Sequence, residues 1–226
     1  MSSVPAKPQR RLAPVASTTR RRSAAERRQE IVTTAIALAD QVGLDRITAR
    51  DIATSMGVAP GLVHHYFATI DELVVAALKF DAGARRGQIE KHVLAHPPLP
   101  ALCGYVVEMS EISRTSARIW LSAWMTEARR TDLAHELARQ DDLDIELLEN
   151  LLRRGLEAGV FRLPDARAAA LRILTVLDGV VVRVSRRLDH QYREEVDALV
   201  WGVVEREVGF APGTLRPVPR PLVGPK

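Results

Sequence analysis

The segment from Thr48 to Phe67, TARDIATSMGVAPGLVHHYF, constrains the fold of this 226-residue chain more than any other stretch. Gly57 can adopt the positive φ angle that a tight turn between two short helices requires. Pro60 suits the first position of the second helix, where its missing N–H costs no hydrogen bond. Two short helices joined by a tight turn are typical of a helix-turn-helix unit, whose second helix reads DNA.

Polar residues at capping positions predict where the neighbouring helices begin. Thr48 and Asp51 have the spacing of a capping box, and so do Thr69 and Glu72, which would open a longer helix at about 70–95. A first helix, at about 24–42, is predicted by one apolar stripe made of Ile31, Ala35, Leu38, Ala39 and Val42.

The remainder of the chain also shows helical periodicity, with no strand-like alternation. Five further helices are predicted, at about 99–112, 115–129, 131–158, 165–186 and 191–208. The fold class is therefore all-α, with about nine helices. The helices at 165–186 and 191–208 are apolar on more than one side, so each needs several packing partners. We expect a homodimer to form through this pair.

Composition divides the chain into four parts. Residues 1–22 are basic and proline-containing without an acid, which predicts a disordered arm that either stays solvated or follows a DNA minor groove. Proline-rich residues 211–226 predict a disordered tail. Between them we expect a helix-turn-helix domain at 23–70 and a helical ligand-binding and dimerisation domain at 71–210.

The charge distribution and the cysteine count limit the possible functions. Residues 1–50 hold ten basic and four acidic side chains, a charge of +6, whereas the other 176 residues carry −2. The positive end suits a polyanion partner such as double-stranded DNA. A single cysteine, Cys103, excludes an internal disulfide, and no apolar run is long enough to span a membrane. We expect a cytoplasmic protein.

The residues around the turn resemble the N-terminal domain of the tetracycline-repressor (TetR) family. The matching elements are the helix from Arg27 to Gly43, Thr48-x-x-Asp51-Ile52-Ala53, Gly57-Val58-x-Pro60-Gly61, and His64-His65-Tyr66-Phe67 followed by Asp71-Glu72-Leu73. Arg118-x-Trp120-Leu121 and Leu177-Asp178-Gly179 resemble the regulatory domain of the branch that includes choline-responsive repressors.

The resemblance implies an all-α homodimeric repressor that binds a palindromic operator and is released by a small-molecule effector. It implies DNA contacts from Thr48, Arg50, Pro60, Gly61, His64, His65 and Tyr66. Three residues depart from the family pattern: Ala59 replaces a capping serine, His64 a tyrosine that contacts phosphate, and Ile70 a lysine. Arg50 and the basic arm are then expected to carry more of the affinity.

An effector pocket is predicted in the second domain. Trp120 and Trp124 lie one helical turn apart and would suit an apolar or cationic ligand, with Tyr105, Met109 and Met125 as neighbours. Simple core packing of the same aromatic residues is the alternative. Asp178 interrupts an apolar helix, so we expect it to pair with Arg183 or Arg118, to bind the ligand, or to lie at the dimer interface.

Other function classes find less support in the sequence. It contains no phosphate loop, nucleophile elbow or dinucleotide fingerprint, so no enzyme activity, catalytic residue or cofactor is predicted. His64 and His65 point about 100° apart on a helix and cannot chelate one metal ion together, whereas His92 and His96 have chelating spacing but precede prolines. No metal site is predicted. The alternative function is an architectural DNA-binding protein without an effector.

Overall fold

The computed structural model describes residues 23–186 and 190–215; the predicted arm 1–22 lies outside that part of the chain. The described ranges contain nine α-helices and no strand, which confirms the all-α prediction. They are α1 (Ala24–Val42), α2 (Ala49–Met56), α3 (Pro60–Tyr66), α4 (Ile70–Ala95), α5 (Pro98–Ser110), α6 (Arg114–Thr126), α7 (Thr131–Glu157), α8 (Ala166–Arg186) and α9 (His190–Val208). Two short 3₁₀ turns, Leu44–Arg46 and Glu127–Arg129, precede α2 and α7.

The helix-turn-helix unit forms as the sequence predicts. Thr48 Oγ1 accepts a hydrogen bond from the Asp51 N–H at 3.2 Å, and Asp51 Oδ2 accepts one from the Thr48 N–H at 3.1 Å, so the capping box of α2 is complete. Gly57 ends α2 in the left-handed region, with φ 66° and ψ 34°. Pro60 begins α3, as predicted.

The cap at the start of α4 is only half of the predicted capping box. Thr69 Oγ1 accepts a hydrogen bond from the Glu72 N–H at 3.1 Å. The Glu72 carboxylate, however, accepts from the N–H of Ala68 rather than from that of Thr69, and it also pairs with Arg28 of α1 at 3.3 Å. Glu72 therefore ties the start of α4 to α1 as well as capping it.

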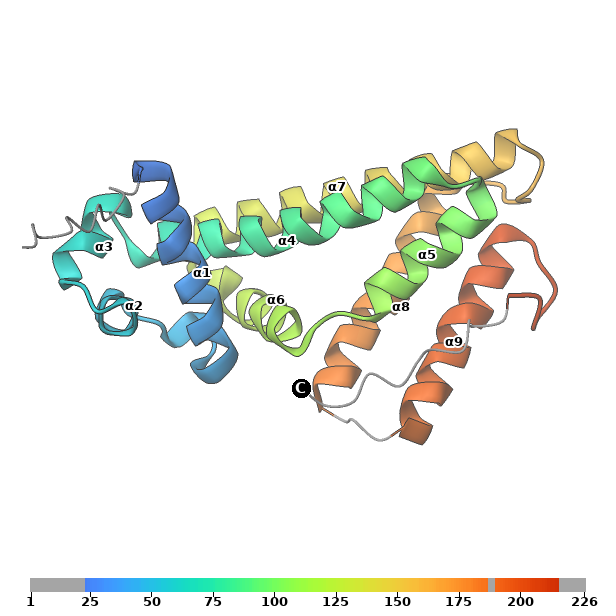
Figure 1. Ribbon diagram of the computed structural model, residues 1–226. Coiled ribbons are helices and arrows are strands. Elements are labelled where there is room, and N and C mark those ends of the chain that lie inside the picture. Colours follow the sequence, from blue (N-terminus) through green and yellow to red (C-terminus); the bar gives the residue numbers. More distant parts are fainter. Residues whose placement is uncertain (1–22, 187–189, 216–226) are drawn as a thin grey trace, which may run out of the picture.

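Figure 1 shows an elongated arrangement in which α1, α2 and α3 form a head at one end and α8 and α9 lie toward the other. Helices α4 and α7 run side by side between the two ends. Their ion pairs join Asp71 to Arg130, Lys79 to Glu136, and Arg86 to Asp144, so residue numbers rise in the same direction along both helices. The two helices are therefore parallel, and both extend from the head into the body.

Two apolar clusters form the core. One lies in the body, among α4, α5, α7, α8 and α9, and includes Leu102, Leu152 and Trp201. The other fills the head but continues into α6 and the start of α7, where Ile119 and Leu137 belong to it. Because this second cluster crosses the expected boundary at 70, the apolar packing of the head continues into the body.

Several predicted details were wrong. Val42 was placed in the buried stripe of α1, but its side chain is 49% exposed, because the helix ends there at Gly43; Val32 is buried instead. The predicted tail 211–226 begins too early. The N–H groups of Gly213 and Leu215 donate to the carboxylate of Glu205, and Leu215 is buried, so the packed structure continues past 210.

The packing of the body core can be tested with two leucines of α7. Leu152 is fully buried, whereas Leu156, one turn further along, is 44% exposed. Leu152→Ala is expected to lower the free energy of unfolding by about 2–5 kcal/mol, because it removes buried methyl groups and leaves a cavity. Leu156→Ala, the matched control, is expected to cost less than about 1 kcal/mol. Urea denaturation followed by circular dichroism measures both, and equal losses would contradict this assignment of the core.

Candidate functional site

The predicted DNA-binding residues lie together on the head. All seven come from α2, α3 and the residue that caps α2. Six of them have exposed side chains or backbone, namely Thr48, Arg50, Pro60, Gly61, His64 and His65. Tyr66 differs, because it is half-buried and packs against the apolar core of the head, with the His65 ring against its own ring in a T-shaped contact at 5.1 Å.

Local structure explains how α3 can approach a groove closely. Nothing lies within 4 Å of the position where Gly61 would carry a Cβ, so this face of α3 is open. The N-cap residue Ala59 makes no side-chain hydrogen bond, so the first N–H groups of α3 lack the side-chain acceptor that a capping serine would supply. Thr48 is already engaged, since its hydroxyl donates to Asp51 Oδ2 at 2.6 Å.

Arg28 on α1 contacts both the end of α3 and the start of α4. Its guanidinium lies over the Phe67 ring, 4.3 Å from the centroid, and pairs with Glu72 at 3.3 Å. Phe67 follows α3 directly and is 1% exposed. Arg28 therefore fixes α1 against both the end of α3 and the start of α4. Its role could not be found from the helical pattern, because the two partners are distant in sequence.

A cavity of about 140 Å³ lies in the body, between helices α4 to α8. It is lined by Arg85, Met109, Ile112, Trp120, Trp124, Asp141, Asp144, Ile145, Leu171, Leu174, Thr175, Leu177, Asp178 and Val181. Four of the five predicted ligand-binding residues are in this set: Met109, Trp120, Trp124 and Asp178. The fifth, Tyr105, is not among the lining residues; it is 1% exposed and packs in the body core.

The two tryptophans form an aromatic wall of the cavity. Their ring centroids are 6.0 Å apart and the planes are tilted by 57°. Trp120 is buried and Trp124 is half-buried, so the first also belongs to the core, as the packing alternative expected. The guanidinium of Arg85 lies 5.6 Å from the Trp120 centroid, so one positively charged side chain of the protein already contacts this aromatic wall. Met125 was proposed as a neighbour, but it is 83% exposed and is not a lining residue.

Three aspartates line the same cavity as the tryptophans, and two of them were not predicted from the sequence. Asp141 and Asp144 lie three residues apart on α7, a spacing that puts both on one face of the helix. Asp178 joins them from α8. Partial desolvation by the surrounding protein raises the pKa of Asp178 to about 6; the Asp141 and Asp144 charges raise it as well, and Arg85 lowers it.

Asp141 behaves in the same way. Desolvation is again the first cause, followed by repulsion from neighbouring carboxylates, and together they raise the pKa of Asp141 to about 6. The lining thus holds an excess of acid over base, with three aspartates and Arg85. The arrangement favours a positively charged ligand beside an aromatic surface.

The predicted partners of Asp178 are engaged elsewhere. Arg183 donates to the Tyr192 hydroxyl at 2.7 Å, and Arg118 donates to the backbone carbonyl of Asp40. The side chain of Asp178 is exposed where the cavity reaches the surface of the single chain, so this carboxylate is not enclosed by the apolar residues of its own helix. The prediction that Arg183 or Arg118 neutralises Asp178 was therefore wrong.

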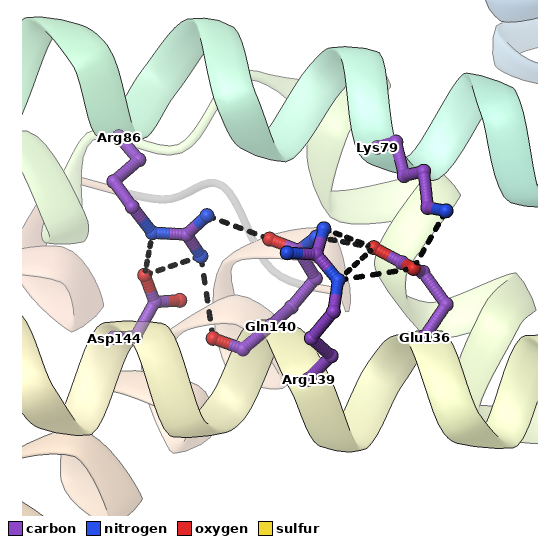
Figure 2. Close-up of polar contacts among 6 residues, drawn as sticks. All are labelled: Lys79, Arg86, Glu136, Arg139, Gln140 and Asp144. Carbon is purple, nitrogen blue, oxygen red and sulfur yellow. Dashed lines mark hydrogen bonds and ion pairs between the residues drawn. The ribbon is translucent and has the colours of Figure 1, made fainter.

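Asp144 has a second role, because it belongs to a polar network between α4 and α7 (Figure 2). The network consists of Lys79 and Arg86 from α4 with Glu136, Arg139, Gln140 and Asp144 from α7. Arg86 pairs with Asp144 at 2.8 Å and donates to Gln140 Oε1 at 2.7 Å. Glu136 accepts from Gln140 at 2.5 Å and pairs with Lys79 at 3.1 Å. We call these six residues the α4–α7 network.

The histidine pairs are placed away from any cluster of ligands. The rings of His92 and His96 stack at 4.2 Å, and one nitrogen of each contacts a backbone carbonyl, of Pro100 and of His92 respectively. Over residues 23–186 and 190–215, no group of three or more histidine, cysteine or acidic side chains is arranged to hold a metal ion. No helix there has both the length and the apolar character of a membrane span.

Two family models match the chain. Residues 31–77 match the model described as bacterial regulatory proteins of the tetR family, which covers the helix-turn-helix unit. Residues 99–213 match the C-terminal domain of the BetI-type transcriptional repressor, which covers the helices that contribute most of the cavity.

Curated relatives carry the same assignment. The HTH-type transcriptional regulator BetI 2 of Chromohalobacter salexigens is 29% identical over 165 residues, which cover 69% of this chain and 75% of the relative. BetI of Stenotrophomonas maltophilia is 27% identical over 162 residues, covering 70% of this chain and 80% of that protein.

Solved structures share the fold. A TetR transcription regulator from Haloarcula marismortui has a TM-score of 0.74 at 19% identity, with 81% of this chain and 99% of that chain covered. A transcriptional regulator from Saccharomonospora viridis in complex with choline has a TM-score of 0.70 at 19% identity, with 78% and 96% covered. These structural similarities show the same fold. The two family models show that the chain belongs to the tetR family of bacterial regulatory proteins, with a BetI-type C-terminal domain, and is a DNA-binding transcriptional regulator.

Proposed function

We propose that this protein represses transcription in the cytoplasm by binding a palindromic operator as a homodimer, and that a small organic cation in the body cavity releases it. The composition of that cavity supports the proposal, because its lining contains two indoles and three aspartates. A quaternary ammonium ion combines a positive charge with an apolar surface, and this lining offers a partner for each. The Saccharomonospora viridis regulator, solved in complex with choline, supports the same ligand class.

On the DNA side, α3 is the proposed recognition helix. Pro60 and Gly61 leave its first turn open to a major groove, and the exposed His64 and His65 extend the contact surface. Arg50, exposed on α2, is the cation best placed to meet a phosphate or a base edge. In a homodimer two such helices would enter successive major grooves about 34 Å apart.

The dimer is proposed to form through α8 and α9. Among the side chains of these helices that the structure describes, three large apolar ones remain exposed in the single chain: Leu171 at 43%, Val182 at 39% and Leu199 at 59%. Exposed apolar surface of this kind is typical of an interface. A second copy would cover it and would fix the distance between the two heads.

The cavity also bears on the alternative function. An architectural DNA-binding protein without an effector needs no ligand site and would be expected to fill its body with apolar packing. A cavity lined by three aspartates and Arg85 together with two tryptophans does not fit that expectation, because purely apolar packing would place apolar side chains there.

His64→Ala tests the DNA face. It is expected to raise the operator dissociation constant by about 3- to 10-fold, the value of one lost hydrogen bond to a phosphate. The loss should be similar on all operator variants, because phosphate contacts carry no base preference. Fluorescence anisotropy measures it, with His135→Ala as control, since His135 is exposed on α7 rather than on the head. A changed base preference would contradict the phosphate role.

Cation binding is tested by isothermal titration calorimetry with choline and tetramethylammonium. Both are expected to bind, whereas an uncharged carbon isostere of choline should bind more weakly. Trp124→Leu is expected to weaken binding by about 3- to 30-fold through loss of cation–π attraction. Met125→Leu, at an exposed position on the same helix, is the control. Equal affinity for choline and its isostere would contradict the cationic ligand.

The affinity for such a cation should depend on pH. Asp141 and Asp178, with pKa values raised to about 6, are ionised at pH 7.5 and become protonated as the pH falls through 6. The cation dissociation constant should therefore rise between pH 7.5 and 5.5. In the double variant Asp141→Asn, Asp178→Asn the affinity should be low and nearly independent of pH. A pH-independent wild type would contradict the role of these carboxylates.

Leu199→Glu tests the proposed interface. A charge placed in the buried centre of a dimer should dissociate it, and operator affinity should fall with it. Sedimentation equilibrium gives the oligomeric state, with Leu94→Glu as control, because Leu94 is also exposed, at 79% against 59% for Leu199, but lies on α4. A Leu199→Glu protein that remains dimeric would place the interface elsewhere.

A further inference from the structure

The structure points to Arg86 as the positioning residue through which a cation in the cavity acts on the DNA-binding head. We infer that the cation competes with Arg86 for the carboxylate of Asp144 and so loosens α4 from α7. The inference rests on the proposed function, because it needs a cationic ligand. It adds the contact by which that ligand is sensed.

Asp144 faces two ways. The residue belongs to the cavity lining, and its carboxylate Oδ1 accepts hydrogen bonds from Arg86 Nε at 3.0 Å and Nη2 at 2.8 Å. Both bonds end on the same oxygen, so Oδ2 is outside the Arg86 contact. Arg86 itself is 9% exposed and is not a lining residue. A ligand in the cavity can therefore contact Asp144 without contacting the guanidinium.

The remaining donors of Arg86 are also engaged on α7. Nη1 donates to Gln140 Oε1 at 2.7 Å, and Nη2 donates to the Gln140 carbonyl at 3.2 Å. Asp144 is the only carboxylate in ion-pair contact with Arg86 in the described part of the chain. One acid thus compensates the charge of this buried guanidinium, and that acid also lines the cavity.

A second cation at Asp144 has an energetic consequence for α4. Two positive charges beside one carboxylate repel each other, and the repulsion is screened less inside a protein than in water. Weakening the one ion pair of a buried arginine costs free energy. Ligand binding in the cavity and the Arg86–Asp144 pair therefore oppose each other. The ligand thereby gains a differential affinity for two arrangements of α4, which coupling between sites requires.

The loosened contact lies on a continuous path to the head. Toward the start of α4, Gln140 donates to Glu136, and Glu136 pairs with Lys79 at 3.1 Å (Figure 2). In the first turn of α4, Asp71 pairs with Arg130 at 3.3 Å. Because α4 is one helix from Ile70 and packs against α1, a shift of α4 along α7 moves the head.

Arg86→Gln distinguishes this role from a purely structural one. Without the competing guanidinium, Asp144 is free for the ligand, so choline should bind more tightly than to the wild type. The variant should also resemble the ligand-bound state: its operator affinity without choline should approach that of the wild type with saturating choline. Added choline should then change operator affinity by less than about twofold, against about 5- to 150-fold in the wild type.

The experiment measures choline affinity by calorimetry and operator affinity by anisotropy, with and without choline, on the full chain. Asp142→Asn is the matched control, because it removes an exposed carboxylate of α7 that does not line the cavity; it should behave as wild type. Asp144→Asn is the second variant. It removes the charge for which the ligand and Arg86 compete, and it should also reduce the effect of choline on operator affinity.

The outcomes separate the two proposals. If choline binds the wild type and releases operator, but Arg86→Gln keeps the wild-type response, the Arg86 route is overturned and the proposed function stands. If Arg86→Gln fails to fold, an Asp144→Asn protein with the wild-type response overturns the route in the same way. If choline does not bind the wild type at all, the proposed ligand class fails, and the route fails with it.

Discussion

The structure depends on one buried positive charge. Arg86 is buried between α4 and α7, where Asp144 and Gln140 accept its hydrogen bonds and offset the cost of burying its charge. This pairing fixes the register of two long parallel helices that join the head to the body. Because Asp144 also lines the cavity, a ligand bound there can affect the interaction that aligns the two helices.

Helix α4 connects this local interaction to both ends of the molecule, because it contributes to both apolar clusters. Its first half contributes Leu73, Leu78 and Ala82 to the cluster that fills the head, and its second half contributes Ile89 and Val93 to the body core. A close-packed helix shared by two cores moves as a unit, since neither core can absorb a shift without repacking. The head cannot therefore be independent of the body.

The sequence predicted helices well and polar contacts poorly. Periodicity, the Thr48–Asp51 cap and the glycine at 57 located α2 and α3, because these signals are local. Their chemistry alone identified four cavity residues: Trp120, Trp124, Met109 and Asp178. Tyr105 was predicted with them, but it is buried in the body core and does not line the cavity. Arg85, Asp141 and Asp144 were missed, because their grouping depends on how α4, α7 and α8 pack, and the same packing decides which arginine meets which acid.

We propose that cation binding in the cavity and operator binding at the head are coupled within the same protein. Linkage requires the effect to be reciprocal, so the cation must bind the operator complex more weakly than the free protein, by the same factor by which it weakens operator binding. The most direct test is the choline dissociation constant, measured by calorimetry for the free protein and for the protein saturated with operator. We expect choline to bind the operator complex more weakly than the free protein. Equal dissociation constants would show that the cavity and the head are independent, and would contradict it.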